Sequence, residues 1–129
     1  MRKKLKLVII AIVGISSFSI LTLINFYLMN NPTESTKESV NNINLIVDYK
    51  NGNIKSHENF TLDNWETTAF NALDKWCDVN FDDYGWGIFV TEIDGIRGGW
   101  IYLVNNGPPK VGAPDYPLND GDEVKWLIP

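Results

Sequence analysis

The sequence predicts an α+β fold for residues 44–129, preceded by one N-terminal transmembrane helix. Two observations predict the fold. One amphipathic stripe with helical spacing lies among several short strand-like segments, and Asn-Gly or Asp-Gly pairs separate some of those segments. A third observation, an uncharged apolar stretch at residues 7–29, predicts the membrane span. One helix among several strands favours a mixed sheet with that helix packed on one face.

The predicted transmembrane helix comprises the 23 uncharged residues of Leu7–Met29, which follow a basic block at residues 1–6. A helix of this length spans roughly 34 Å, enough to cross a hydrocarbon core of about 30 Å. The preceding positive charge predicts that the N-terminus stays inside and that the C-terminal domain is extracytoplasmic. We therefore expect a single-pass protein of the cell membrane, anchored through residues 7–29.

A cleaved signal peptide is the alternative, because it shares the basic start and the apolar centre. Ser17-Phe18-Ser19 resembles its small-residue cleavage site. The apolar stretch continues for about ten residues beyond that site, longer than a signal peptide requires, which favours an uncleaved anchor. A buried core helix is the third alternative. Residues 1–29 are thus interpreted as the anchor or signal peptide.

Residues 30–43 are interpreted as a polar linker, because they contain Pro, Ser and Thr and few apolar side chains. The domain that follows, residues 44–129, has 6 basic and 14 acidic side chains. An acidic domain without a basic stripe binds phosphate backbones poorly, so no nucleic-acid partner is expected. One Cys and one His exclude an internal disulfide and a zinc site of the usual type, so we expect no metal and no required cofactor.

The first two strands are predicted to form a hairpin. Asn44–Lys50 is rich in β-branched and aromatic residues, which favours a strand. Asn51-Gly52-Asn53 supplies the positive-φ positions of a tight turn. Ile54–Leu62 is a weaker, more polar second strand.

One helix is predicted after this hairpin, with Asp63 or Asn64 as its N-cap and an end near Asp78. Phe70 and Cys77 widen its apolar face, so Cys77 is expected to be a buried thiol. The centre of that face combines five residues at offsets of 0, 4, 7, 8 and 11: Trp65, Ala69, Ala72, Leu73 and Trp76.

The remaining segments predict three more strands. Residues 80–87 contain two Gly and are expected to form a loop. Ile88–Ile93, Trp100–Val104 and Glu123–Ile128 then have strand patterns, separated by turns. The order is β-β-α-β-β-β, and the simplest closure places the first and last strands side by side in the middle of the sheet. That layout is a β-grasp, or ubiquitin-like, fold.

Five stretches of the domain form a recognisable pattern: Val47-Asp48-Tyr49 with Asn51-Gly52, a helix with Ala69 and Leu73, Phe89–Ile96, Gly99–Gly107, and Val111–Ala113 through Trp126. The pattern resembles the transcobalamin-like C-terminal domain family, whose fold is a β-grasp. In transcobalamin and intrinsic factor this domain covers the upper face of cobalamin, and a large helical barrel holds most of the vitamin. The barrel has no counterpart in this sequence. The resemblance implies a corrinoid as a candidate ligand.

The candidate ligand-binding residues are Trp86, Gly99, Trp100, Tyr102, Val111 and Gly112. The resemblance implies that the segments matching Gly99–Tyr102 and Val111-Gly112 face the ligand. Strand alternation puts Trp100 and Tyr102 on one face, and Ile101 and Leu103 on the other. We expect the aliphatic pair to face the helix and the aromatic pair to face outward as a binding patch. The reverse orientation of this strand is the alternative.

The function that these features favour is a non-catalytic, membrane-tethered module that binds a small planar or amphipathic ligand. A surface module for protein–protein interaction or adhesion is the alternative. Motifs of nucleophilic or nucleotide-dependent catalysis do not occur in the sequence, so no enzymatic activity is expected.

Overall fold

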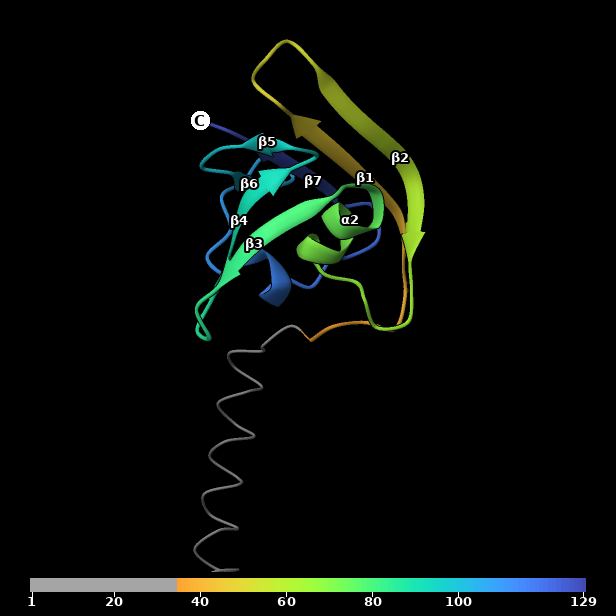
Figure 1. Ribbon diagram of the computed structural model, residues 1–129. Helices are drawn as coiled ribbons and strands as arrows, with labels where there is room; N and C mark the ends of the chain where they lie inside the picture. Colours follow the sequence, from red (N-terminus) through yellow and green to blue (C-terminus); the bar gives the residue numbers. More distant parts are fainter. Residues whose placement is uncertain (1–34) are drawn as a thin grey trace, which may run out of the picture. The chain divides into compact units, whose positions relative to one another are not determined.

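The computed structural model describes residues 35–129 (Figure 1). The predicted membrane span at residues 7–29 lies outside the described residues. Within residues 35–129, none of the helices has both the length and the apolar character that a membrane crossing requires. The described part contains two sheets and one α-helix, which confirms the predicted mixed α+β class.

The larger sheet has four strands in the order β2-β1-β7-β6. Its central pair, β1 (Val40–Asp48) and β7 (Glu123–Leu127), is parallel, with Leu45 opposite Val124. Strand β2 (Ile54–Leu62) pairs antiparallel with β1, and β6 (Ile101–Val104) pairs antiparallel with β7. The first and last strands therefore lie side by side in the middle, as the predicted layout requires.

A second sheet of three antiparallel strands contains β3 (Val79–Asp83), β4 (Ile88–Ile93) and β5 (Ile96–Arg97). The expectation of a single mixed sheet is wrong. The loop expected across residues 80–87 is confined to residues 84–87, because residues 80–83 belong to β3. Strand β3 forms because its backbone pairs with β4, although four of its five side chains are exposed. Without a buried face, β3 has no hydrophobic alternation to predict it.

The helix α2 (Ala69–Trp76) begins at Thr68, several residues later than predicted. Thr68 and Asn71 form a reciprocal capping box, in which each side chain accepts a hydrogen bond from the other's backbone N–H. Trp65 lies outside the helix with a φ of 64° and a side chain that is 62% exposed. Figure 1 shows α2 between the long β1–β2 hairpin and strand β3.

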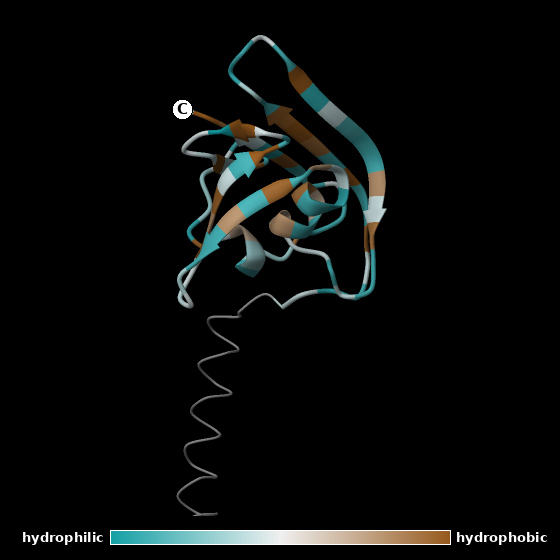
Figure 2. Ribbon diagram, viewed as in Figure 1, coloured by the Kyte–Doolittle hydropathy of each residue, from teal (hydrophilic) through white to brown (hydrophobic). Residues whose placement is uncertain are grey.

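The core lies between the larger sheet and α2. The side chains of Ile43, Leu45 and Val47 alternate along β1 and are fully buried. In Figure 2 the C-terminal part of β1 is coloured as hydrophobic, whereas β2 at the edge of the sheet is mainly hydrophilic. Cys77 is buried, as predicted, and burial is the main cause that raises the pKa of its thiol to about 12.

Strand β1 starts at Val40, four residues before the predicted start, so part of the predicted linker belongs to the domain. Lys37 is also bonded to the domain. Its backbone N–H donates to the Thr67 hydroxyl at 3.2 Å, and its ammonium donates to the Asn119 side chain at 2.6 Å. The polar composition of residues 30–43 concealed these contacts because they are made by backbone and polar groups.

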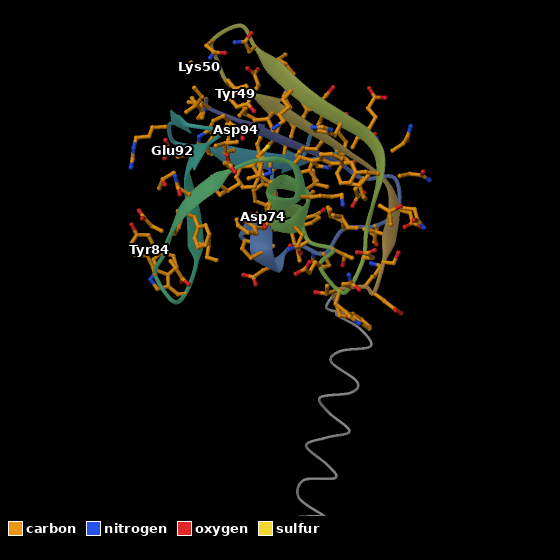
Figure 3. The ribbon with its side chains drawn as sticks, turned by 45° about the vertical axis from the view of Figure 1, so that its right-hand side comes forward. Tyr49, Lys50, Asp74, Tyr84, Glu92 and Asp94 are labelled. Atoms are coloured by element: carbon orange, nitrogen blue, oxygen red, sulfur yellow. The ribbon has the colours of Figure 1, made fainter. Side chains whose placement is uncertain are left out.

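Asp94, at the turn between β4 and β5, connects the smaller sheet to the larger one (Figure 3). Its carboxylate accepts hydrogen bonds from the Tyr49 hydroxyl, from the backbone N–H of Asp78 at 2.9 Å and from the Lys55 ammonium at 3.1 Å. Burial alone would raise the pKa of Asp94, but these hydrogen bonds outweigh it and lower the pKa below its ordinary value.

Candidate functional site

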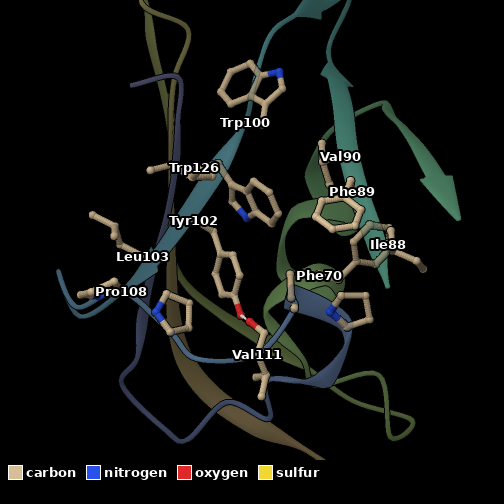
Figure 4. Close-up of a pocket in the computed structure, with 15 residues that line it drawn as sticks. Phe70, Ile88, Phe89, Val90, Trp100, Tyr102, Leu103, Pro108, Val111 and Trp126 are labelled. Carbon is tan, nitrogen blue, oxygen red and sulfur yellow. Dashed lines mark hydrogen bonds between the residues drawn. The ribbon is translucent and has the colours of Figure 1, made fainter. Parts of the chain in front are cut away.

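A cavity of about 360 Å³ opens between strand β4 of the smaller sheet and strand β6 of the larger one (Figure 4). The connection that follows β6 lines another of its sides, and α2 contributes one aromatic ring. None of the lining residues carries a charged side chain. They are Phe70, Ile88, Phe89, Val90, Trp100, Ile101, Tyr102, Leu103, Pro108, Pro109, Val111, Gly112, Ala113, Pro114 and Trp126.

Strand pairing places two large aromatic rings of one wall together. Tyr102 on β6 is directly opposite Trp126 on β7 in the antiparallel register. Their rings stack with centroids 5.2 Å apart and an interplanar angle of 24°. Tyr116 meets the Tyr102 ring edge-on at 6.3 Å. The result is a flat, apolar wall, which suits a planar ligand group.

The hydroxyl of Tyr102 donates a hydrogen bond to the backbone carbonyl of Val111 (Figure 4). This bond ties strand β6 to the connection that lines the cavity. Burial, followed by the nearby Tyr116 and Asp115, raises the pKa of Tyr102, so its hydroxyl stays protonated and remains a donor near neutral pH.

One polar group beside the cavity has no partner. The indole N–H of Trp126 is buried and makes no hydrogen bond within residues 35–129. Figure 4 shows that the indole nitrogen lies on the side of the ring that faces Tyr102. An unpaired buried donor is unfavourable, so an acceptor that reached this N–H would be stabilised.

Four of the six predicted site residues line this cavity: Trp100, Tyr102, Val111 and Gly112. Gly99 and Trp86 do not line it. At Gly99 no heavy atom lies within 4 Å of an added Cβ, whereas at Gly98 an added Cβ would lie 2.5 Å from the side chain of Ile128. The missing side chain of Gly98 therefore makes room for Ile128, whereas the space beside Gly99 is open.

The predicted orientation of strand β6 is wrong. Trp100 is only 7% exposed and donates from its indole N–H to the Ile96 carbonyl at 2.9 Å, whereas Ile101 is 43% exposed. The aromatic pair faces the space between the two sheets. Helix α2 has only eight residues, and the second sheet adds width to that space, so large rings fit where aliphatic side chains were expected.

The opposite wall of the cavity was not among the predicted site residues. Ile88–Ile93 was predicted as a strand and Phe70 as part of the helical apolar face, and neither was named as ligand-binding. One sequence signal could have indicated this wall: Phe89 follows an aromatic, glycine-rich turn. In the structure its side chain is 49% exposed near the start of β4.

Trp86 lies at the turn between β3 and β4, next to cavity-lining Phe89 but not itself among the lining residues, and its side chain is 78% exposed. It stacks on Tyr84 with centroids 5.9 Å apart, and Phe89 meets both rings edge-on. We refer to Tyr84, Trp86 and Phe89 as the hairpin cluster. Trp86 is therefore separated from the four predicted site residues that line the cavity.

Charged groups that could hold a metal are dispersed. Residues 35–129 contain no group of three or more His, Cys, Asp or Glu side chains arranged to hold a metal ion. Tyr102 is the one titratable side chain among the cavity-lining residues of the described part. The arrangement is suited to contact with an apolar surface, to a hydrogen bond donated by the Trp126 N–H and to one accepted by the Tyr102 hydroxyl oxygen, whose own hydrogen is donated to Val111.

Comparison with known proteins supports the architecture. Residues 66–128 match the family described as "Domain of unknown function (DUF4430)". No curated protein matches the chain. Two similar solved structures are a "putative metal binding protein" from Ruminococcus gnavus ATCC 29149 and haptocorrin in complex with Cbi.

Both solved structures are similar to this chain in fold. The R. gnavus protein is 17% identical with a TM-score of 0.53, over 67% of this chain and 93% of its own. Haptocorrin is 18% identical with a TM-score of 0.54, over 72% of this chain but only 26% of its own. The matches confirm the resemblance to a transcobalamin-like domain that the sequence motifs indicated.

Proposed function

We propose that this protein is a membrane-tethered extracytoplasmic module that binds the planar or apolar part of a small molecule without chemical conversion. The observation that carries the proposal is the uncharged cavity of about 360 Å³ with its stacked wall of Tyr102 and Trp126. Ligand sites are commonly apolar clefts of about 300–1,000 Å³ with a few polar groups that fix orientation. The Tyr102 hydroxyl and the Trp126 N–H are the polar groups here.

A corrinoid is the ligand class that we favour. The similarity in fold to haptocorrin, which was solved with Cbi, supports this choice. A corrinoid is larger than the cavity, so it would place one edge or face between β4 and β6 and leave the rest outside. The chain spans about a quarter of haptocorrin, so fewer contacts are available and we expect an affinity that is micromolar or weaker.

The tether follows from the basic block at residues 1–6 and the uncharged stretch at 7–29. An extracytoplasmic domain held at the membrane would raise the local concentration of its ligand at the membrane surface. Binding in the micromolar range is sufficient to concentrate a ligand in this way.

We favour a small ligand over a protein strand as the partner. Strand β2 is at an edge of the larger sheet, where a partner strand could add, but it is polar and its register with β1 is interrupted between Val40 and Leu45. Asn59, within β2, has a φ of 54°, which distorts this edge further. Polar side chains and bulges are the features that protect an edge from pairing.

The test uses the full chain in phosphatidylcholine nanodiscs and equilibrium dialysis against cyanocobalamin. A charge placed in the cavity by Val111→Asp should weaken binding by at least tenfold, because a carboxylate would lose hydration against apolar rings. Ile54→Asp is the matched control: Ile54 is 64% exposed and Val111 is 48% exposed, and Ile54 does not line the cavity. Absent saturable binding, or equal weakening by the two variants, would refute the corrinoid proposal.

A further inference from the structure

The domain leaves an unusual number of large apolar side chains at its surface. The exposed ones are concentrated on and beside the β3–β4 hairpin, where Phe81, Tyr84, Trp86 and Phe89 are all more than 40% exposed. The two exposed tryptophans of the described part are Trp65 and Trp86. The candidate ligand site explains Phe89 in part but neither tryptophan.

Both tryptophans lie at the end of the domain where the described chain begins. The backbone N–H of Trp65 donates to the Glu38 carbonyl at 3.1 Å, so Trp65 is adjacent to the first residues of the domain. Figure 1 shows the β3–β4 turn at this same end, and the β1–β2 turn at the opposite end. In Figure 3, Tyr84 of the hairpin cluster is correspondingly far from Lys50 of the β1–β2 turn.

The length of chain between the domain and the predicted span is short. Lys37 is held by Thr67 and Asn119, and only residues 30–36 separate it from Met29, the last residue of the predicted span. Eight peptide steps cover at most about 30 Å. A domain of this size has a radius of gyration of about 12 Å. The end that carries Lys37 is therefore held within about one domain diameter of the bilayer.

We propose that Trp65 and the hairpin cluster contact the phospholipid interface of the membrane in which residues 7–29 are anchored. This inference rests on the membrane tether proposed above. Trp and Tyr rings favour the interface between acyl chains and headgroups because they combine an apolar body with a polar edge. The tether supplies an effective concentration in the millimolar range, so weak insertion of two or three rings is sufficient for occupancy.

The charges around these rings specify the kind of surface. Asp83 and Asp115 line a surface depression together with Trp86, and Asp82 accepts a hydrogen bond from the Tyr84 hydroxyl at 3.3 Å. Asp63 and Glu66 are close to Trp65 in sequence. Acidic neighbours repel anionic headgroups, so the contact depends on apolar insertion rather than on charge. Zwitterionic phosphatidylcholine is accordingly the lipid with which the contact is expected to be observed.

The experiment measures quenching of tryptophan fluorescence by brominated acyl chains. The full chain is reconstituted into phosphatidylcholine vesicles with or without bromine on the acyl chains. All five tryptophans lie between residues 65 and 126, so the predicted span contributes no signal. Quenching should be marked for the natural chain and should fall by at least half in the Trp65→Phe/Trp86→Phe double variant.

The matched control adds Ile54→Trp to that double variant. Ile54 is 64% exposed and lies at the opposite end of the domain, so a tryptophan there should not restore quenching. Equal quenching in the natural chain and the double variant overturns the inference, as does restored quenching by Ile54→Trp. If the natural chain floats with the vesicles but is not quenched, the inferred lipid contact is wrong although the tether stands. A protein partner would then be the candidate for the hairpin cluster. A chain that does not float with the vesicles overturns the tether and this inference together.

Discussion

Substituting Asp94 by Asn tests whether one carboxylate holds the two sheets together. Asparagine has nearly the same shape and tolerates the positive φ of 50° at this position, but it has one acceptor oxygen where the carboxylate has two. The Asp94 bonds use both oxygens: Oδ1 accepts from the Asp78 N–H, and Oδ2 accepts from the Tyr49 hydroxyl and the Lys55 ammonium. Hydrogen bonds to charged groups contribute about 1.5–3 kcal/mol, and neutral ones about 0.5–1.5 kcal/mol. At least one bond should therefore be lost, and each bond that remains should weaken by about 1 kcal/mol.

Exposure reduces this sum. The side chains of Asp94 and Lys55 are 25% and 32% exposed, and Lys55 also donates to the Trp76 carbonyl at 2.7 Å, which the variant retains. Solvent screening of such a pair brings the expected loss in the free energy of unfolding to about 1–2 kcal/mol at pH 7.

The pH dependence of this loss has a definite sign. The pKa of Asp94 is lowered from 3.8 in the folded domain. A carboxyl group with a lowered folded-state pKa contributes stability above its unfolded pKa and loses it as the pH falls through its folded pKa. The difference between the natural domain and the variant should therefore be full at pH 7, shrink below about pH 4 and vanish once Asp94 is protonated.

Urea denaturation of residues 35–129, followed by tryptophan fluorescence, measures the difference. Glu92→Gln is the matched control, because Glu92 lies two residues away and accepts one hydrogen bond from Asn80 at the surface, which Gln can also accept. The control should change stability by less than about 0.5 kcal/mol. A deficit in Asp94→Asn that is equal at pH 7 and at pH 3, or no deficit at pH 7, would show that the charge of Asp94 does not contribute as described.

Three further predictions follow from burial and capping. In urea denaturation, Trp100→Ala should lower the free energy of unfolding by about 3–5 kcal/mol and Ile101→Ala by less than about 1 kcal/mol, because the Trp100 ring is buried and the Ile101 side chain is exposed. A larger loss for Ile101→Ala than for Trp100→Ala would contradict the observed orientation of β6. Cys77 should resist iodoacetamide at pH 8 in the folded domain and react after denaturation, because its pKa is raised to about 12; rapid labelling of the folded domain would contradict its burial. Thr68→Ala should cost about 1 kcal/mol through loss of the N-cap of α2, and an unchanged urea midpoint would show that the capping box contributes little.

The fold could be predicted where sequence periodicity and buried faces coincide. Leu45 and Val47 lie two residues apart in a short β-branched and aliphatic run bounded by Asn44 and Asp48, and both are buried on β1. Tight turns were equally predictable: Asp94 and Gly95 both adopt positive φ, as an Asp-Gly pair in a two-residue turn requires. The central position of the first and last strands followed from element order alone.

The start of α2 could not be located in the same way. Trp65 has helical spacing to Ala69, and Asp63 is as suitable an N-cap as Thr68, so local signals supported two different starts. The choice between them depends on tertiary contacts: the Trp65 backbone bonds to Glu38, and the Thr67 hydroxyl donates to the Lys37 carbonyl at 2.8 Å. Partners about 30 residues apart in the chain are not visible in a local pattern.

The candidate site was predicted largely by residue identity but not by geometry. Trp100 and Tyr102 line the cavity, although the prediction placed them on the outer face of the sheet. Alternation along a strand shows which side chains share a face, but it does not determine which face is covered. The face that is covered depended on the position of the second sheet. Its strand β3 has mostly exposed side chains and therefore no hydrophobic pattern that predicts it.

The parallel pairing of β1 with β7 sets the order in which this domain can fold. The two strands at the centre of the larger sheet are separated in sequence by the helix, the smaller sheet and the cavity-lining connection. The sheet cannot close until Glu123–Leu127 has been synthesised, so the nascent domain lacks its central strand pair until that point. Contacts of such long sequence separation also slow folding. Under the extracytoplasmic location proposed above, late closure would be an advantage, because the central strand pair could not form before translocation was under way.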